Sequence, residues 1–386
     1  MNKLLRRIFY ISIIALTLFE IVNVYFIMPM PGSQEITSIN IAYFLYTHRW
    51  LFRTIFTLMI AASSLSAFKA SKKWIPGGTL IVAIIIIYFF NGIMTADKMF
   101  KQPEKLSFLN KEDNKVSDSS LVICIINNGE VKGYPIQFMA YHHQVQDNVG
   151  GKPLIITYCS VCRTGRVYEP IVNGHHEVFR LVGMDHFNAM FEDATTKSWW
   201  RQSTGEAIAG PLKGKLLQEA ESMQLSVKKL FELYPAAMIM QSDEASTNHY
   251  DTLRKFEKGL SKSNLTRTDS LSWEKKSWII GIQIESSSKV YDWIKLKEQH
   301  IINDKIGETP VFLALSADGE SFAAFLRPVL SENFKINNDT LFSNGVVYDF
   351  SGRCLNDPSK QLTRVKAYQE FWHSWKTFHP NSERYQ

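Results

Sequence analysis

The chain contains little cysteine for its length, with four residues among 386. Disulfide-rich secreted scaffolds are far shorter, and a chain of this size can bury a substantial core without cross-links, so that class is excluded. Excess charge is also missing from most of the sequence. The net charge of +6 arises within residues 1–96, and residues 97–386 balance 35 basic against 35 acidic side chains. A nucleic-acid-binding surface is therefore not expected.

Motifs of the common enzyme classes are lacking as well. The sequence has no phosphate-binding glycine loop, no Ser-His-Asp series and no HExxH zinc motif. The standard kinase and hydrolase functions therefore have no support. The sequence identifies no substrate, small ligand or protein partner.

Three apolar runs of membrane-spanning length lie within the first 96 residues, at 8–28, 50–68 and 79–96. The first is longer than a usual signal-peptide core and lacks a small-x-small cleavage site, which favours a transmembrane helix. In the second run, Arg53 lies near the start, where its long side chain can reach the membrane interface. The third follows Pro76-Gly77-Gly78, which indicates a turn. We therefore expect three transmembrane helices, with the lipid bilayer as a partner.

The basic residues predict the orientation of these helices. They gather before the first span and between the second and third, whereas the opposite loop holds fewer. The residues on the richer side are Lys3, Arg6, Arg7, Lys69, Lys72 and Lys73, and those on the other are Arg49 and Arg53. Because cytoplasmic loops carry the positive excess, the amino terminus is expected in the cytoplasm. The C-terminal domain is then periplasmic or extracellular, attached to the plasma (inner) membrane.

Glu20 lies inside the first apolar run. An acidic group at that depth is costly and is a candidate for function. Pairing with Arg49, Arg53 or a polar neighbour at a helix interface explains it equally well, so both interpretations stay open.

Segments of the remaining chain repeat at fixed offsets. Tyr134–Ile156 and Tyr291–Leu313 align without a gap at an offset of 157, and Leu217–Pro235 and Leu362–Pro380 align at an offset of 145. Such self-similarity is typical of duplicated architectures. Short apolar runs flanked by Gly and Pro predict strands in both copies.

We therefore expect an α+β fold after the membrane helices: a strand-rich, duplicated ectodomain whose two halves cover 115–240 and 275–386. Each half is expected to be closed by an amphipathic helix. The aromatic stripe in the last one, Tyr368, Phe371, Trp372, Trp375 and Phe378, is expected to pack in the core. Residues 97–114 and 241–274 are expected to be linkers, the second because it is rich in Ser, Asp, Lys and Thr.

A Cys-x-x-Cys pair, Cys159 and Cys162, occurs in the first half alone, and the equivalent positions hold Ser316 and Gly319. A strand precedes the pair and a turn into another strand follows it, which resembles a metal-binding knuckle more than a redox pair at a helix start. Metal binding is the leading interpretation, with the reaction and substrate undetermined. Two alternatives stay open: a redox or Cys-nucleophile enzyme, and a non-catalytic binding module in which the pair is an inert disulfide.

Histidine would supply further ligands to a metal at this pair, and zinc or copper would suit such donors. His142 is the favoured third ligand, or the base for a nucleophilic cysteine. Because His142 and His143 are expected on a strand, they should face opposite sides, and at most one joins the cysteines. His175, His176 and His186 are further candidates for a metal ligand. His175 and His176 follow a turn dipeptide and are therefore expected at the surface.

The segment 193–211 gathers polar side chains beside Gly and Trp, which fits a loop that lines a pocket. A tight structural turn fits equally well. The pocket candidates are Asp193, Trp200, Gln202, Gly205 and Glu206, and Glu206 is a candidate general base. Of the other cysteines, Cys124 is expected to be buried and Cys354 to be a surface thiol, with a bridge between them also open.

These motifs, taken in order, resemble the bacterial family named domain of unknown function 3179 (DUF3179). The matching series is His142, Asp147, Gly150, Gly151, Pro153, Thr157, Tyr158, Cys159, Cys162, Gly183, Asp193, Ser198, Trp200, Gln202, Gly205, Glu206, Ala207, Ile208, Gly210 and Pro211. The chain departs from the family pattern at His143, Gln146 and Ser160, where the family has an acidic residue, Asn and Pro. The resemblance extends to the carboxyl terminus and implies a shared fold, but no particular activity.

Overall fold

The computed structural model describes residues 2–70, 72–357 and 359–386. The chain forms two compact units. The first, here the anchor unit, comprises Met1–Lys101, Val178–Arg201 and Glu206–Lys215. The second, here the cysteine unit, comprises Gln102–Glu177, Gln202–Gly205 and Leu216–Gln386. The predicted first half, 115–240, is therefore divided between the two units.

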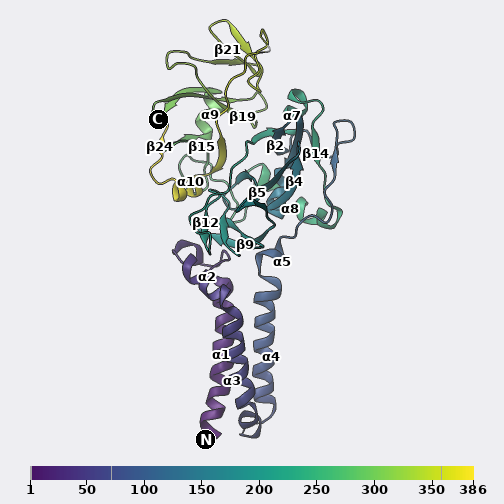
Figure 1. The fold of residues 1–386 in the computed structure, drawn as a ribbon, viewed down its shortest axis with the longest axis vertical. Helices are drawn as coiled ribbons and strands as arrows, with labels where there is room; N and C mark the ends of the chain where they lie inside the picture. The colour runs from purple at the N-terminus through teal and green to yellow at the C-terminus, as the bar shows by residue number, and fades with distance from the viewer. Residues whose placement is uncertain (1, 71, 358) are drawn as a thin grey trace. The chain divides into compact units, whose positions relative to one another are not determined.

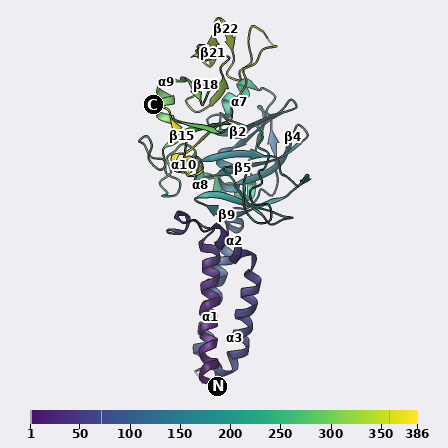
Figure 2. The same cartoon turned by 60° about the vertical axis from the view of Figure 1, so that its left-hand side comes forward.

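Three helices of the anchor unit are long and apolar enough to cross a membrane, over Lys3–Tyr25, Arg49–Lys69 and Trp74–Ile93. They correspond to α1 (Asn2–Tyr25), α3 (Arg49–Ala70) and α4 (Trp74–Tyr88), which continues into a π-helical turn, η2 (Phe89–Ile93). Figure 1 shows α1, α3 and α4 side by side, and Figure 2 shows α1 beside α3. Shorter helices of this unit are η1 (Ser33–Glu35), α2 (Ile39–Thr47) and α5 (Ala96–Met99). The predicted apolar runs are thus helical.

The expected turn at Pro76-Gly77-Gly78 is wrong, because α4 begins at Trp74 and includes these residues. Proline is tolerated in the first turn of a helix, where its missing N–H would have no intrahelical partner. Glu20 is paired with Arg53: Nε and Nη2 of Arg53 lie 2.6 and 2.8 Å from the two carboxylate oxygens. Nη2 also donates to Asn91 Oδ1 at 2.9 Å, so all three long helical segments contribute.

The anchor unit also contains a four-stranded antiparallel sheet in the order β12-β11-β10-β9. Its strands are β9 (Phe179–Asp185), β10 (Asn188–Asp193), β11 (Trp199–Arg201) and β12 (Ala207–Ala209). The sheet packs on the turn that follows α1, where Met184 N donates to Ile27 O at 2.8 Å. A Cβ at Gly183 would lie 2.1 Å from the same carbonyl oxygen, so this close approach requires glycine.

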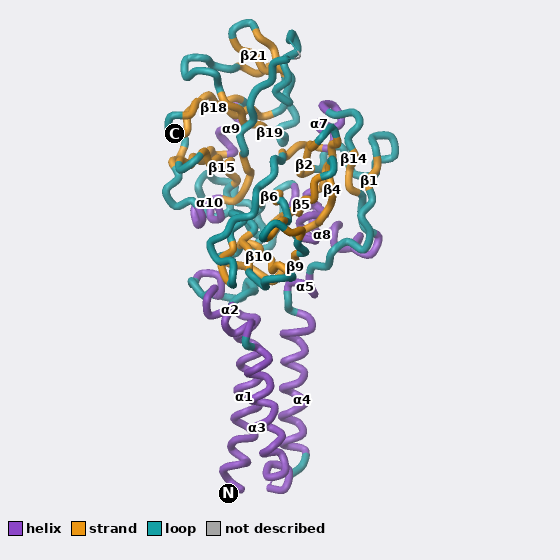
Figure 3. The backbone as a smooth tube through the Cα atoms, in the orientation of Figure 1, coloured by secondary structure: helices purple, strands orange, loops and turns teal. Residues whose placement is uncertain are grey.

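The cysteine unit is built from two sets of strands that follow the same pattern, which Figure 3 shows in orange. In the first set, a sheet ordered β1-β14-β3-β2-β13 accompanies β4-β5-β6; in the second, β23-β15-β16-β24 accompanies β17-β18-β19. The first-set strands are β1 (Phe108–Leu109), β2 (Leu121–Asn127), β3 (Glu130–Pro135), β4 (Gln144–Val149), β5 (Lys152–Cys159), β6 (Thr164–Tyr168), β13 (Met223–Ser226) and β14 (Met238–Met240). The second-set strands are β15 (Trp278–Ile284), β16 (Ser287–Asp292), β17 (Ile301–Ile306), β18 (Thr309–Leu315), β19 (Phe322–Leu326), β23 (Ala367–Phe371) and β24 (Glu383–Arg384).

The two sets also pair in the same register. Ser226 pairs with Leu121 in the first set and Phe371 with Trp278 in the second, at offsets of 145 and 157. The side-chain contacts agree: the Tyr134 hydroxyl donates to Asp147 at 2.7 Å, and the Tyr291 hydroxyl, 157 residues later, donates to Asp304 at 3.1 Å. Two apolar clusters are buried in this unit. One joins the two sets, because Val122 and Leu230 of the first set belong to it together with Phe325 of the second, and the other lies in the second set around β15 and β18.

The helices of this unit are shorter than predicted. They are α6 (Ile136–His142), α7 (Val227–Leu233), α8 (Thr247–Glu257), α9 (Trp293–Gln299), α10 (Trp372–Phe378) and η3 (Glu244–Ser246). The expected closing helices instead begin as strands β13 and β23, and only seven residues of each are helical. The aromatic stripe is therefore divided between a strand and a helix, because short apolar runs do not distinguish the two periodicities.

The linker predicted at 241–274 contains α8, whose Tyr250 and Phe256 are each 2% exposed. Its low overall hydropathy concealed a small apolar face. The linker predicted at 97–114 contains β1, which pairs with β14. The remaining strands are β7 (Ile171–Val172), β8 (His175–His176), β20 (Lys335–Asn337), β21 (Thr340–Ser343) and β22 (Val346–Tyr348).

Candidate functional site

The cysteine pair lies in the tight turn between β5 and β6. Cys159 ends β5 and pairs with Thr164 at the start of β6, and Cys162 lies within the turn. All four cysteines of the chain are described, and none of them forms a disulfide. Both side chains of the pair are completely buried. The predicted strand-turn-strand context of the pair is confirmed, so the pair does not lie at the start of a helix of its own.

The side chain of Gln202 is hydrogen-bonded to both strands of this hairpin. Its Nε2 donates to Thr157 Oγ1 and to Thr164 O, both at 3.1 Å. These two threonines are the residues two positions before Cys159 and two after Cys162. The Tyr168 hydroxyl in turn donates to Gln202 O at 2.7 Å. Gln202 was predicted to line a pocket, and the structure uses it to hold the two strands that carry the cysteines.

Gly205 lies in the same short segment with a φ of +67°, and a Cβ there would lie 2.6 Å from the Tyr168 ring. A side chain would therefore displace the tyrosine that contacts Gln202. This is a structural requirement for glycine, as the alternative of a tight turn predicted.

Lys276 lies beside the turn, although it is distant in sequence. Its Nζ donates to Val161 O, between the two cysteines, at 3.2 Å, and also to Leu265 O. Burial lowers the pKa of Lys276, while the thiols of Cys162 and Cys159 act in the opposite direction. The ammonium is thus close enough to interact electrostatically with both sulfurs. A cation in this position stabilises a thiolate.

The second half of the unit also contacts the turn. Phe371 N donates to Cys162 O at 2.8 Å. The Nε2 of His373 lies 3.2 Å from Val161 O and donates to it, because a carbonyl oxygen can only accept. Burial, together with the neighbouring Lys276 charge, lowers the pKa of His373 to about 4. The imidazole is therefore neutral at pH 7.

A buried arginine follows the second cysteine. Arg163 is 1% exposed, lies 3.8 Å over the Trp278 ring and donates from Nη2 to Glu257 O at 3.0 Å. Its Nε and Nη1 have no hydrogen-bond partner among the described residues, nor does the Tyr158 hydroxyl. Burial raises the pKa of the Glu257 carboxyl to about 7, although the Arg163 charge opposes this. The turn is thus surrounded by buried ionisable groups.

The raised pKa of Glu257 predicts that the stability of the protein depends on pH. Because the folded state raises the pKa of Glu257 from 4.5 to about 7, its contribution to stability is greatest below pH 4.5 and is lost as the pH rises through about 7. Relative to a Glu257→Gln variant, the free energy of unfolding of the wild type should fall by about 3 kcal/mol over this range. Denaturant unfolding of both proteins from pH 4.5 to 8 measures the difference.

The effects of other titratable groups on the free energy of unfolding are the same in both proteins and cancel in that comparison. His143 and His373, whose pKa values are both lowered to about 4, destabilise both proteins equally as the pH falls below 6.5. Glu308, 95% exposed in its side chain, is the matched control, and Glu308→Gln should leave the profile unchanged. Parallel profiles for wild type and Glu257→Gln would contradict the expectation.

The prediction that His142 and His143 lie on a strand is wrong. His142 ends α6, and His143 follows with a φ of +63°. The Nε2 of His142 is 2.5 Å from the Tyr250 hydroxyl of α8. His143 Nδ1 donates to Tyr141 O at 3.1 Å, and its backbone O accepts from Tyr158 N. The backbone of His143 therefore lies beside the residue that precedes Cys159.

Across residues 2–70, 72–357 and 359–386, no group of three or more His, Cys, Asp or Glu side chains is arranged to hold a metal ion. The set of Cys159, Cys162 and His142 therefore stays a prediction from the sequence. Of the other histidines, His175 and His176 are exposed beside a turn, as expected, and His186 pairs with Asp185 at 2.9 Å in the anchor unit.

The remaining pocket candidates lie in the anchor unit. The Asp193 carboxylate accepts from Thr196 and Ser198 N, and from Trp200 Nε1 at 2.9 Å. It is completely buried and organises the turn between β10 and β11. Glu206 lies 3.3 Å from Arg201 Nη1 in a partly exposed ion pair. Gln202 and Gly205 belong to the other unit, so the five candidates do not form one group.

Cys124 is buried, as predicted, and burial raises the pKa of its thiol to about 12. The prediction of a surface thiol at Cys354 is wrong, because this residue is only 5% exposed. The strand bridge between Tyr348 and Cys354 draws it inward.

Four residues around the cysteines were not predicted from the sequence: Arg163, Glu257, Lys276 and His373. Arg163 adjoins the second cysteine and could have been suspected from that position. Glu257 comes from the predicted linker, Lys276 lies two residues before β15, and His373 comes from α10. Their proximity depends on how the chain folds back, and no local pattern signals it.

The fold and site define a mixed helix and strand protein with three candidate membrane helices and a buried pair of thiols in a β-hairpin turn. The family model described as protein of unknown function (DUF3179) matches residues 101–382, and the chain belongs to this family. The match starts after the last candidate membrane helix, which ends at Ile93. Neither a curated protein nor a solved structure matches the chain.

Proposed function

We propose that this protein is a membrane-anchored dithiol protein in which Cys159 and Cys162 are oxidised and reduced reversibly by thiol-disulfide exchange. The observation that carries the proposal is the position of Lys276, whose Nζ donates to Val161 O, between two cysteines that form no disulfide. In redox proteins with the pair at a helix start, the helix dipole stabilises the thiolate. In this protein, Lys276 from a distant segment supplies the positive charge that stabilises the thiolate.

The exchange balances without any further cofactor. One cysteine thiolate attacks a sulfur of a partner disulfide, forms a mixed disulfide and releases the first partner thiolate. The second cysteine, as thiolate, then attacks the mixed disulfide, which closes the Cys159–Cys162 bond and releases the second partner thiolate. Two electrons pass from the pair to the partner, and the two protons lost by the cysteines go to the partner's sulfurs. Because both sulfurs are buried, the turn must open away from Lys276 and His373.

The test uses the full-length protein in lipid nanodiscs, equilibrated with reduced and oxidised glutathione or dithiothreitol at set ratios. Free thiols are then trapped with a maleimide and counted by mass spectrometry. We expect one two-electron transition that yields a Cys159–Cys162 disulfide, at about −120 to −270 mV. The Lys276→Met variant should react more slowly with a disulfide probe, by about tenfold or more.

The chain supplies its own matched controls. A Cys124→Ser/Cys354→Ser variant should keep the transition, and Cys159→Ser should lose it. A bond that persists below about −300 mV is typical of an inert structural disulfide, and would overturn the proposal. Failure to form the bond at any ratio would overturn it as well.

Metal binding by the same pair is a second candidate, supported by two soft sulfur donors in one turn. Thiolates favour monovalent copper or zinc. A third bond from His142, as the sequence predicts, would use Nδ1 if Nε2 keeps its contact with the Tyr250 hydroxyl. Titration with copper(I) or zinc should give stoichiometric binding that is lost in Cys159→Ser. Loss in His142→Ala as well would support His142 as a ligand, and metal content unchanged by Cys159→Ser would contradict this candidate.

The duplication of the two halves is also a proposal. It is supported by the equal offsets of the paired strands, and by two further backbone bridges, Tyr168–Glu219 and Phe325–Arg364, whose partners are again 157 and 145 apart. Under this proposal the cysteines occupy one copy only, as expected for a site added to a shared scaffold.

We place the amino terminus in the cytoplasm and the cysteine unit on the periplasmic or extracellular side of the plasma membrane. The support is the distribution of basic residues around the three candidate spans. Disulfide exchange is common in such oxidising compartments. Digestion of the cysteine unit by protease added to intact spheroplasts would agree with this orientation, and protection until lysis would reverse it.

A further inference from the structure

The two cysteines of the pair occupy different places in the hairpin. Cys159 is the last residue of β5, and its backbone pairs with Thr164 of β6. Cys162 lies in the turn 160–163 that joins these strands. The backbone of a strand residue is held by its ladder, whereas a turn residue depends on contacts from other segments. The two cysteines are therefore held in place by different groups.

Earlier parts of the chain hold Cys159. The preceding residue, Tyr158, donates its N–H to His143 O at 2.8 Å. Two positions before the cysteine, Thr157 Oγ1 accepts from Gln202 Nε2 at 3.1 Å. Together with the β5–β6 ladder, these contacts come from residues that precede position 203. Movement of the later segments therefore leaves Cys159 in place.

Later segments hold Cys162. Phe371 N donates to Cys162 O at 2.8 Å. The carbonyl of the preceding residue, Val161, accepts from Lys276 Nζ and from His373 Nε2, each at 3.2 Å. All three donors come from the second half of the unit. Release of these contacts frees the turn that carries Cys162, while the β5–β6 ladder keeps its hydrogen bonds.

Two cations lie beside Cys162. Lys276 binds the carbonyl that adjoins this cysteine, and Arg163 is the next residue in the chain, 1% exposed and 3.8 Å over the Trp278 ring. Burial lowers the pKa of Lys276, and among the groups that oppose this effect Cys162 acts most strongly. A neighbouring cation stabilises a thiolate, and the thiolate is the nucleophile in exchange. The charges therefore favour Cys162 over Cys159.

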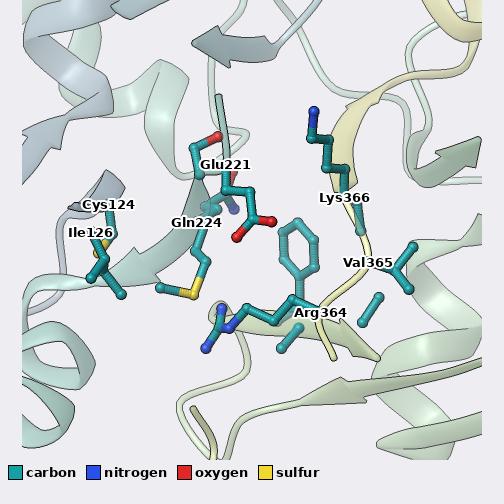
Figure 4. A pocket seen from close by; sticks show the side chains of 13 residues that line it. Cys124, Ile126, Glu221, Gln224, Arg364, Val365 and Lys366 are labelled. Atoms are coloured by element: carbon teal, nitrogen blue, oxygen red, sulfur yellow. The ribbon is translucent and has the colours of Figure 1, made fainter. Parts of the chain in front are cut away.

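The cavity shown in Figure 4 does not lead a partner to the pair. It is lined by residues of β2, β13 and β19, with Cys124 among them, and holds about 60 Å³ of space. Ligand sites are commonly several times larger. The described residues that line it include neither Cys159 nor Cys162. A partner disulfide therefore meets the pair only when the turn opens, and the turn carries Cys162.

We propose that Cys162 is the attacking cysteine of the pair and Cys159 the resolving one. This assignment rests on the thiol-disulfide exchange proposed above. The Cys162 thiolate attacks one sulfur of the partner disulfide, whose S–S bond breaks and releases one partner thiolate. The Cys159 thiolate, held in β5, then attacks the Cys162 sulfur, closes the Cys159–Cys162 bond and releases the second partner thiolate. The two protons of the cysteines pass to the two partner sulfurs.

The test measures the attack by each cysteine separately. The full-length protein in lipid nanodiscs carries Cys124→Ser/Cys354→Ser together with either Cys159→Ser or Cys162→Ser. Each protein reacts with dithiobis(nitrobenzoate), an aromatic disulfide whose coloured thiolate reports the rate. We expect the protein that retains Cys162 to react faster than the one that retains Cys159, by about tenfold or more. Equal rates, or a faster reaction of Cys159, would overturn the assignment.

The pH dependence of the rate distinguishes an effect of charge from one of packing. In the protein that retains Cys162, the midpoint of the profile should lie below about 8.5, the ordinary pKa of a cysteine thiol. Lys276→Met should raise this midpoint, and Lys262→Met, at an exposed lysine, should leave it unchanged. A midpoint that Lys276→Met does not move would overturn the assignment of Cys162 as the stabilised thiolate.

The wild type supplies a measurement that needs no substitution in the pair. The reduced protein is alkylated with less than one equivalent of iodoacetamide, and the modified cysteines are identified by peptide mass spectrometry. Cys162 should be modified first and Cys124, whose thiol pKa is raised by burial to about 12, last. Modification of Cys159 before Cys162 would overturn the proposal. A wild type that forms no reversible disulfide with glutathione would overturn the proposed function, whereas the order of alkylation still decides the roles of the two cysteines.

Discussion

Replacement of Arg166 by alanine is expected to lower the free energy of unfolding by about 3–5 kcal/mol. Arg166 Nη2 lies 3.0 Å from Glu370 Oε2, and the two side chains are 3% and 1% exposed. The guanidinium also lies 3.4 Å from the centre of the Tyr368 ring. Without the arginine, the Glu370 carboxylate would remain buried without its countercharge, and its desolvation would go uncompensated. Denaturant unfolding of the protein in detergent measures the loss.

The double variant Arg166→Met/Glu370→Met is the informative comparison. It removes both charges and should be less destabilised than Arg166→Ala alone, because no unpaired charge is left. Lys305→Ala removes a partner of an exposed ion pair with Glu308 and should cost less than about 1 kcal/mol. A loss below 1 kcal/mol for Arg166→Ala would show that the charge pair contributes little to joining β6 and β23.

Replacement of Arg53 by alanine is expected to destabilise the anchor unit by a similar amount, about 3–5 kcal/mol. Glu20 is 1% exposed, and both of its carboxylate oxygens bind the Arg53 guanidinium. In a lipid environment, an unpaired carboxylate at that depth has no water to solvate it. The midpoint of thermal unfolding in nanodiscs should therefore fall for Arg53→Ala.

Two further variants distinguish the loss of the Glu20–Arg53 ion pair from the replacement of an arginine in this region. Arg49→Ala removes an arginine that stacks on Tyr46 and should have a small effect. Glu20→Gln/Arg53→Gln retains hydrogen-bonding groups without charges and should recover much of the lost stability. If Arg53→Ala unfolds at the wild-type temperature, Glu20 has another stabilising partner or a functional role that does not involve Arg53.

Features that depend on near neighbours in the chain were predictable. Continuous apolar runs must be helical in lipid, because each backbone group then finds its partner within the segment. The turn at Asn173-Gly174 and the hairpin that carries Cys159 and Cys162 were also visible, because Gly and Asn allow positive φ values and strand patterns flank them.

Sequence patterns that fit both a strand and a helix did not predict the secondary structure correctly. Seven-residue helices α7 and α10 follow strands β13 and β23, and a short apolar run is compatible with either state. The polar segment 241–274 has few apolar positions, yet Tyr250 and Phe256 of α8 are buried. Two aromatic residues suffice to dock a helix whose average composition is hydrophilic.

The amino-acid order alone therefore established the apolar helices, the hairpin and the spacing of the two sets of strands, since each rests on interactions within or between adjacent segments. The surroundings of the sulfurs were settled only when the chain folded. Lys276 and His373 both reach Val161 O, although they are 115 and 212 residues away from it. Burial and charge at Cys159 and Cys162 come from such distant groups, and they have no signature in the local sequence because electrostatic and packing forces act through space.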